Sequence, residues 1–335
     1  MVASLRPNIE AFLPIAILLA SDQGCDLQID DLLEDGYFAN LDLGFAPFVS
    51  AFYGGRRPTL HRSGKAVQSK PATSGKSALL FSGGVDSFYS LRRLLDDDIR
   101  PDYLINIDAG AHGTNNLARR SRLKNVFNVA DKIGIPTVVI ETNFHVLYRA
   151  PHVRCATIRN LAACLSLFPD VDTFYYSSAV AYGAVSFQTG REHGIHFIDH
   201  AVASNILPSG VRAIEIGYDA TRLQKTAAIV RDDLSSEHLD VCTNAPYQAD
   251  WSSGTPLNCG ACIKCLRTIA TLEYLGELER FESAFLLHMW RNDRRRALEM
   301  LKRSDEPLDQ EVIELFGREI GSPRSRIVSR FWRKP

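Results

Sequence analysis

Hydrophobic and polar positions change period along the chain and predict alternating strands and helices from residue 77 onward. Short apolar runs predict buried strands, and apolar positions three and four residues apart predict helices. The expected strands are Ala78–Phe81, Tyr103–Ile107, Thr137–Ile140, Thr173–Tyr176 and Arg212–Ile216. The expected helices are Val85–Leu95, Asn115–Ile133, Ile158–Leu167 and Thr221–Val230.

This alternation is typical of an α/β fold. Strands separated by helices of this length need crossover connections, so we expect a doubly wound, mostly parallel sheet with helices on both faces. In such sheets, ligands bind at the carboxyl ends of the strands. The loops that follow the strands are therefore the first places to look for chemistry.

A polar and basic stretch precedes this region and suggests a domain boundary. Residues 60–76 read LHRSGKAVQSKPATSGK, without hydrophobic periodicity, and are expected to form a linker. Residues 1–59 then form a small N-terminal accessory unit, in which the apolar run 11–20 is expected to be a buried core segment. Residues 77–235 form the α/β domain, residues 236–280 a cysteine-rich region and residues 281–335 a helical, basic tail.

Composition narrows the classes of function. With 45% hydrophobic residues among 335, the chain can bury a sizeable core. A formal net charge of -1 gives no overall field for binding nucleic acid or a membrane surface. The apolar run 11–20 is shorter than the roughly 20 residues of a membrane span. A cytoplasmic protein without membrane contact is expected.

Basic residues in the C-terminal region could bind nucleic acid or another protein. They are Arg294, Arg295, Arg296, Arg324, Arg326, Arg330, Arg333 and Lys334. Basic termini are most often solvated, so nucleic acid is not the expected partner, although docking to nucleic acid or to another protein stays an alternative.

The first expected strand runs directly into Ser82-Gly83-Gly84-Val85-Asp86-Ser87, and a helix follows at once. Two adjacent glycines let the backbone turn sharply and approach an oxyanion. The helix N-terminus offers unpaired N–H groups to phosphate, and the two serines add hydroxyl donors. Asp86 is placed to hold magnesium or to cap the helix. Together, these six residues predict a phosphate-binding loop.

Four of the seven cysteines form a cluster with the spacing C-x16-C-x2-C-x2-C. They are Cys242, Cys259, Cys262 and Cys265. Four converging thiolates without an open position are typical of structural zinc, and an iron–sulfur cluster is the alternative. Such a cluster fits a reducing cytoplasm better than a disulfide framework does. Cys155 and Cys164 lie in an apolar stretch and are expected to be core residues.

The sequence SGGVDS after a strand is the signature of the PP-loop ATP pyrophosphatase superfamily, which this chain resembles. The loop, the strand ending INIDAG, Lys225 in a helix and the closing motif CGACIKC follow the order seen in 7-cyano-7-deazaguanine synthase. The resemblance covers residues 77–275. It implies that ATP adenylates a carboxylate, that pyrophosphate leaves, that ammonia then displaces AMP, and that zinc is structural.

The resemblance also implies roles for individual residues. The ATP-binding residues would be Ser82, Gly83, Gly84, Val85, Asp86, Ser87 and Asp108, with Mg²⁺ beside the phosphates. Lys225 would face the phosphates, with Arg222 as a second candidate, so the catalytic set is Asp86, Lys225 and Arg222. Two of these roles have a plain structural alternative: Asp108 as a turn residue, and Lys225 as a solvated lysine. His112 would line the same pocket or be a solvated loop residue, and Thr221 is expected to cap the helix that carries Lys225.

The substrate and the nucleophile stay open at this point. A small carboxylate or carbonyl compound attacked by ammonia or an amine is the leading hypothesis. The alternatives are a sulfurtransferase, for which Cys155 would be the first thiol to test, a PP-loop sugar amidotransferase, and a conjugation partner without catalysis. Ammonia must be free or come from a partner, since no glutaminase cysteine motif is recognisable. A homodimer also stays among the alternatives.

Overall fold

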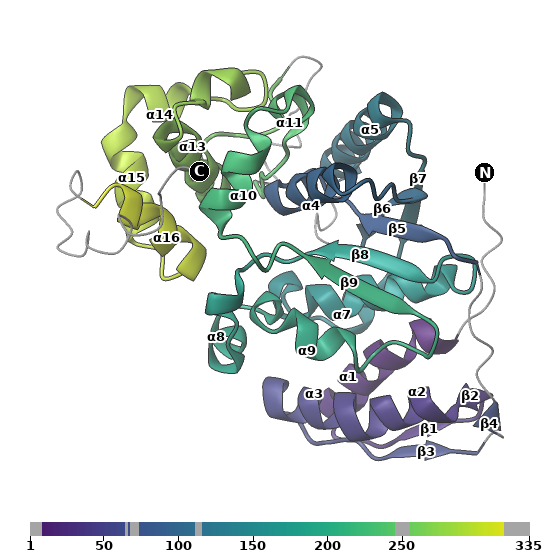
Figure 1. Cartoon of the computed structure of the whole chain (residues 1–335). Helices are drawn as coiled ribbons and strands as arrows, with labels where there is room; N and C mark the ends of the chain where they lie inside the picture. Colours follow the sequence, from purple (N-terminus) through teal and green to yellow (C-terminus); the bar gives the residue numbers. More distant parts are fainter. Residues whose placement is uncertain (1–8, 64–65, 68–73, 111–115, 245–254, 318–335) are drawn as a thin grey trace. The chain divides into compact units, whose positions relative to one another are not determined.

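The computed structural model describes residues 9–63, 66–67, 74–110, 116–244 and 255–317 (Figure 1). By packing, the chain divides into two compact units. Unit 1 is built from residues 1–81, 93–114 and 130–218, and unit 2 from residues 82–92, 115–129 and 219–335. The first strand of the expected α/β domain and the phosphate loop that follows it therefore belong to different units.

Unit 1 contains a five-stranded sheet in which every neighbouring pair is parallel, in the order β7-β6-β5-β8-β9. The strands are β5 (Ser77–Leu80), β6 (Tyr103–Asp108), β7 (Thr137–Glu141), β8 (Thr173–Ser177) and β9 (Arg212–Ile216). Helices flank this sheet, so the expected α/β class with a parallel sheet is confirmed (Figure 1). The strand order reverses at β5, and such a reversal is where parallel sheets bind ligands.

The N-terminal segment shares one hydrophobic core with the sheet. Helix α1 (Leu13–Gln23) buries Ile17 and Leu18, and it packs against α7 (His152–Cys164), whose Ile158 and Leu161 reach the same core. The expectation that residues 11–20 are a buried core segment is confirmed. Because the core is continuous, the described residues 9–59 are part of the body of unit 1.

Short strands pair residues 60–62 and 66–67 with this segment. Strand β1 (Leu27–Ile29) pairs in parallel with β3 (Leu60–Arg62), and β2 (Leu33–Glu34) pairs with β4 (Ala66–Val67). The sequence predicts a linker over residues 60–76, and within that range residues 60–62 and 66–67 form these short strands. They are strands because their backbone pairs with residues distant in sequence, and local hydrophobic periodicity does not predict such pairing.

The remaining elements of unit 1 are short and connect the larger ones. The first group is η1 (Ile9–Ala11), α2 (Asp35–Ala39), the π-helix η2 (Asn40–Phe45) and α3 (Ala46–Tyr53). The second group is α6 (Phe144–Leu147), η3 (Leu165–Leu167), η4 (Tyr182–Ala184), α8 (Phe187–Glu192), η5 (Ile195–Phe197) and α9 (Asp199–Ala203).

Unit 2 is helical in its described part. Helices α4 (Val85–Asp96) and α5 (Asn116–Ile133) contribute residues to both units and match the expected helices closely. The others are α10 (Arg222–Ile229), α11 (Asp233–His238), α13 (Ile263–Tyr274), η6 (Leu278–Phe281), α14 (His288–Asn292), α15 (Arg294–Lys302) and α16 (Pro307–Leu315).

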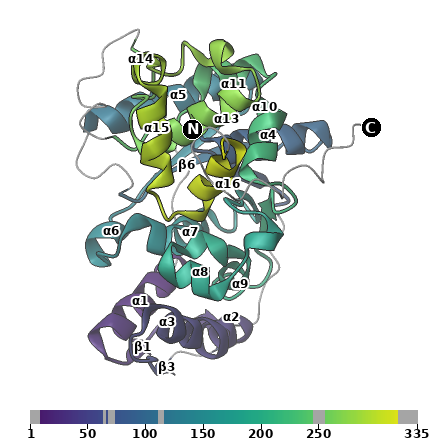
Figure 2. The same ribbon diagram turned by 90° about the vertical axis from the view of Figure 1, so that its left-hand side faces the viewer.

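The C-terminal helices, in the stretch expected to be a helical, basic tail, pack together. Helices α13, α15 and α16 contact one another, and α14 contacts α15 (Figure 2). The guanidinium of Arg294 lies 2.6 Å from the Glu273 carboxylate, whereas Arg295 and Arg296 are exposed. The expected basic residues from Arg324 onward lie outside the described residues.

Within the described part of the chain, no helix has both the length and the apolar character that crossing a membrane requires.

A buried carboxyl in unit 1 makes stability depend on pH. Burial, helped by the nearby charge of Glu215, raises the pKa of Asp199 well above its usual value, against the hydrogen bond from Thr157. The folded chain therefore keeps a proton that the unfolded chain releases above about pH 4. The free energy of unfolding falls by about 1.4 kcal/mol per pH unit between that pH and the raised pKa.

Asp199→Asn is expected to remove this contribution. Urea unfolding at several pH values above about pH 4 checks it, with the exposed Asp170→Asn as the control. The variant should show a flatter dependence on pH than the wild type and the control. Equal slopes in all three proteins would contradict the role given to Asp199.

Candidate functional site

The expected phosphate loop lies in unit 2 and leads into α4. Gly83 has a φ of +80°, a backbone conformation that side chains disfavour, which explains a glycine there. The Gly84 N–H points at the Ser82 hydroxyl (3.4 Å), and the Ser87 hydroxyl donates to the Gly84 carbonyl (3.0 Å). The loop is thus closed by its own serines at the start of a helix, where N–H groups and the helix dipole favour anions.

Two cations from α10 approach the aspartate of this loop. Arg222 Nη2 lies 2.9 Å from Asp86 Oδ2, and Lys225 Nζ lies 3.7 Å from Asp86 Oδ1. Lys225 is fully buried, so it is not the solvated lysine of the alternative reading. Thr221 and Gln224 form a capping box at the start of α10, which confirms the expected cap and fixes the helix that carries both cations.

A third cation, which was not among the residues predicted for the site, comes from α5. Arg122 Nη2 lies 3.2 Å from Asp240 Oδ1, and the Asp240 N–H donates to the Gly83 carbonyl at 2.8 Å. Burial raises the pKa of Asp240 to about 6, although the Arg122 charge opposes the shift. Arg122 stands in the basic run ARRSRLK, where it reads like any solvated residue.

Several buried polar atoms around the loop lack a hydrogen-bond partner among the described residues. They are Arg122 Nε, Arg222 Nε, Arg267 Nη1 and Asp86 Oδ1. Buried hydrogen-bond donors nearly always have an acceptor in folded proteins, so donors without one are candidates for contact with a ligand. Cationic donors beside a glycine loop and a helix N-terminus suit a polyphosphate, and a carboxylate oxygen suits the magnesium ion that accompanies it.

Helix α16, near the C-terminus, makes polar contacts with both α10 and α13. Arg267 of α13 and Asp309 of α16 form a buried ion pair at 2.9 Å. The Leu223 N–H in the first turn of α10 points at Glu311 Oε1 at 3.3 Å. Residues expected only as a tail therefore help to place the helix that carries Arg222 and Lys225.

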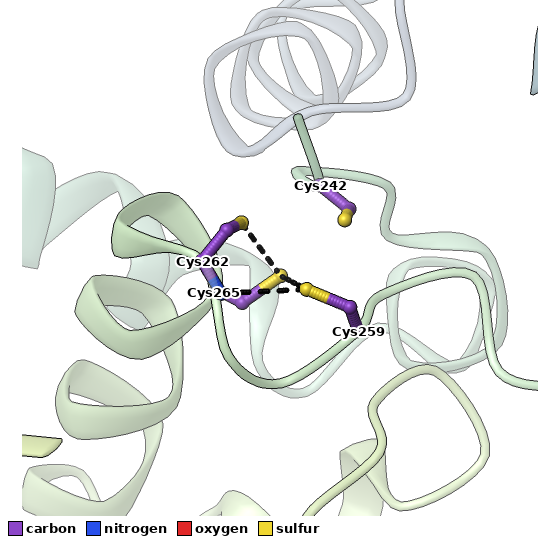
Figure 3. Close-up of side chains that lie close together, drawn as sticks. All are labelled: Cys242, Cys259, Cys262 and Cys265. Carbon is purple, nitrogen blue, oxygen red and sulfur yellow. Dashed lines mark hydrogen bonds between the residues drawn. The ribbon is translucent and has the colours of Figure 1, made fainter. Parts of the chain in front are cut away.

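The four clustered cysteines converge on one point (Figure 3). Their sulfur atoms all lie within 4.8 Å of one another. The sulfurs of Cys262 and Cys265 lie 3.4 Å apart, and those of Cys259 and Cys265 lie 3.9 Å apart. A tetrahedral zinc ion with bonds of about 2.3 Å requires sulfurs about 3.8 Å apart. The cluster therefore fits a metal ion such as zinc.

Backbone N–H groups also prepare these sulfurs for a metal. Ala261 and Cys262 donate to Cys259 Sγ at 3.4 and 3.3 Å. Hydrogen bonding from the Cys242 thiol lowers the pKa of Cys259 to about 6 and also lowers the pKa of Cys262, whereas hydrogen bonding within the cluster raises the pKa of Cys242 and of Cys265. Thiolates are the metal-binding form, so two of the four cysteines already favour the charge state that a metal needs.

The turn between Cys259 and Cys262 admits only glycine at position 260. Gly260 has a φ of +66°, and a Cβ there would lie 1.7 Å from the Leu286 carbonyl oxygen. Gly260→Ala should therefore lower the free energy of unfolding by more than about 3 kcal/mol and reduce the bound metal.

Gly276→Ala is the matched control for this change. Gly276 also has a positive φ, +73°, but no described atom lies within 4 Å of its would-be Cβ, so a loss of about 1 kcal/mol is expected. Urea unfolding and metal analysis of both variants give the comparison. Equal losses in the two variants would rule out the steric explanation.

The other expected site residues lie elsewhere. Asp108 ends β6, and its carboxylate accepts from the Gly110 N–H at 3.3 Å, a turn contact. His112 lies outside the described residues. Cys155 is fully buried, and desolvation raises its pKa to about 11, which disfavours the reactive thiolate that a sulfur-transfer step needs.

Neither models of protein families nor curated proteins give a match to this sequence.

Proposed function

We propose that this chain is an ATP-dependent ligase that adenylates a carboxylate or carbonyl substrate, releases pyrophosphate and then accepts attack by ammonia or an amine. The observation that carries the proposal is the group of cations around the glycine loop. Arg122, Arg222 and Lys225 approach it from two helices, and two of the three keep buried donor atoms without partners among the described residues.

Such a group suits a reaction in which pyrophosphate is the leaving group. The substrate oxygen attacks the α-phosphorus of ATP, and the bond from that phosphorus to the bridging oxygen breaks. Negative charge then grows on the departing pyrophosphate, where fixed cations stabilise it most. The amine next attacks the activated carbon, its proton passes to solvent or a base, and AMP leaves with the oxygen taken from the substrate.

Two metals belong to this proposal. Asp86, the one carboxylate of the loop, would hold the Mg²⁺ that accompanies ATP and supplies further charge stabilisation at the phosphates. The four clustered cysteines would hold zinc in a structural role, because they offer four ligands and leave no position open for substrate. Ammonia would come free from solution or from a partner protein.

Exchange of labelled pyrophosphate into ATP tests the proposal without knowledge of the nucleophile, because adenylation is reversible. The intact protein is incubated with Mg²⁺, ATP, labelled pyrophosphate and single carboxylates from a panel that includes 7-carboxy-7-deazaguanine. Exchange that needs one acid and falls by at least about 100-fold in Asp86→Asn supports the proposal. The exposed Asp96→Asn in the same helix is the control. No exchange with any acid would count against adenylation.

A further inference from the structure

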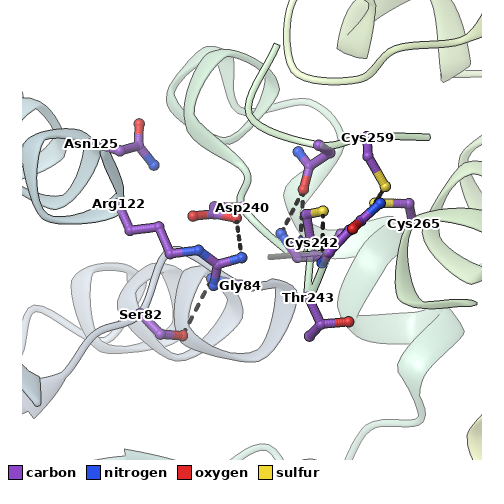
Figure 4. A network of polar contacts seen from close by, with 12 residues as sticks. Ser82, Gly84, Arg122, Asn125, Asp240, Cys242, Thr243, Cys259 and Cys265 are labelled. Atoms are coloured by element: carbon purple, nitrogen blue, oxygen red, sulfur yellow. Dashed lines mark hydrogen bonds and ion pairs between the residues drawn. The ribbon is translucent and has the colours of Figure 1, made fainter. Parts of the chain in front are cut away.

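The segment 238–242 lies between the phosphate loop and the cysteine cluster within unit 2 (Figure 4). On one side it binds the loop and α5. The Asp240 N–H donates to the Gly83 carbonyl at 2.8 Å, and the Asp240 carboxylate pairs with Arg122. Asn125 Nδ2 donates to the His238 carbonyl at 2.8 Å, and the side chains of these two residues are 2.7 Å apart.

On the other side, a buried asparagine beside a metal-ligand candidate holds the same segment. Asn258 Oδ1 accepts from the N–H groups of Val241 and Cys242 at 2.8 and 3.0 Å. Asn258 Nδ2 donates to the carbonyls of Leu239 and Ala284 at 2.7 and 2.8 Å. Asn258 is fully buried, and its amide meets the backbone on both sides of Asp240.

Gly83 and Gly84 also lie beside this segment. A Cβ on Gly83 would lie 3.7 Å from Asp240 Cβ, and one on Gly84 would lie 3.7 Å from the Asp240 carbonyl oxygen. A displacement of Asp240 would therefore move the loop backbone, Arg122 or both. Because Cys242 follows two residues later and Cys259 is next to Asn258, the position of Asp240 depends on how these two cysteines are held.

We propose that the four-cysteine centre fixes the position of the phosphate loop, with Asn258 and Asp240 as positioning residues. Binding of a metal ion at the cysteines then raises the affinity of the loop for a polyphosphate, and binding of the polyphosphate raises the affinity of the cysteines for the metal. The metal would draw Cys242 and Cys259 together and fix the ends of the 239–242 backbone that Asn258 clamps. Asp240 would then hold the Gly83 carbonyl and Arg122 in the arrangement that a polyphosphate needs. This inference rests on the proposed function.

Thermodynamic reciprocity supplies the test. If the metal raises the affinity for pyrophosphate by a given factor, pyrophosphate must raise the affinity for the metal by the same factor. Zinc affinity of the intact, folded protein is measured by equilibrium competition with a chromogenic chelator, with excess Mg²⁺ and with or without saturating pyrophosphate. We expect an increase of about tenfold. Binding of zinc by free pyrophosphate would lower the apparent zinc affinity of the protein, so it cannot produce the expected increase.

Two variants show whether the coupling runs through this segment. Asn258→Asp keeps the oxygen that accepts from Val241 and Cys242 but loses both donors, so zinc should still bind while the increase with pyrophosphate shrinks to less than about twofold. Asn292→Asp makes the same replacement at an exposed asparagine at the end of α14, outside this segment, and should keep the full increase. Circular dichroism and zinc content verify that each variant is folded and loaded.

The outcomes separate this inference from the function beneath it. Calorimetry first measures whether the zinc-loaded protein binds Mg-pyrophosphate or MgATP. No binding of either would overturn both proposals. Binding together with an unchanged zinc affinity would overturn the coupling and leave the proposed function standing. An increase that is the same in Asn258→Asp as in the wild type would overturn the role of Asn258 and Asp240.

Discussion

Replacing Lys225 with methionine is expected to lower the rate of substrate-dependent pyrophosphate formation by about 100- to 1,000-fold. Lys225 Nζ is fully buried and lies 3.7 Å from Asp86 Oδ1, so its charge acts where solvent screening is weak. Methionine has nearly the same volume and should leave the packing of α10 intact. The loss should appear mainly in kcat, because charge on pyrophosphate grows as the bond breaks.

Two further variants make this prediction specific. Lys225→Arg keeps the charge and should recover part of the rate. Lys302→Met removes an exposed lysine of α15 and should leave the rate unchanged. Steady-state release of pyrophosphate gives kcat and KM for all of them. A Lys225→Met protein with full kcat would remove Lys225 from the proposed machinery.

Cys259→Ser is expected to remove the bound metal and to lower the free energy of unfolding by more than about 4 kcal/mol. Cys259 is buried, and its sulfur receives two backbone N–H groups and faces Cys265. A structural zinc site contributes much of the folding free energy of the segment around it. Metal analysis and urea unfolding of the variant and the wild type measure both effects.

Cys25→Ser serves as the control, because Cys25 is exposed and apart from the cluster. It should keep both the metal and the stability. If metal analysis finds iron together with inorganic sulfide in the wild type, the four cysteines hold an iron–sulfur cluster and not zinc. A wild-type protein purified without metal, or a Cys259→Ser protein as stable as the wild type, would contradict the structural role of the four cysteines.

The sequence predicted well whatever depends on local pattern. All five strands and three of the four expected helices of the α/β region appear close to their expected bounds, because their apolar period follows from burial of one face or one run. The helix expected at Ile158–Leu167 instead begins at His152 and ends at Cys164. Thr221 was identified as a cap from its place before a helix, and the capping box is present. The cysteine spacing likewise predicted sulfurs that converge.

Features that depend on distant partners could not be predicted. Strands β3 and β4 are held by pairing with β1 and β2, and no periodicity within three residues reveals that. Arg122 looks solvated in sequence but is paired with Asp240, more than a hundred positions away. Asn258 is one asparagine among many until its amide is seen between Leu239, Val241, Cys242 and Ala284.

The fate of α-labelled ATP tests the central claim most directly. The zinc-loaded protein is incubated with Mg²⁺, labelled ATP, the acid that supports exchange and ammonium, beside the Asp86→Asn variant. The account predicts labelled AMP and pyrophosphate in equal amounts, formed only with the acid present and lost in the variant. Labelled ADP with inorganic phosphate would contradict it, because cleavage would then occur at the γ-phosphate and no adenylate would form.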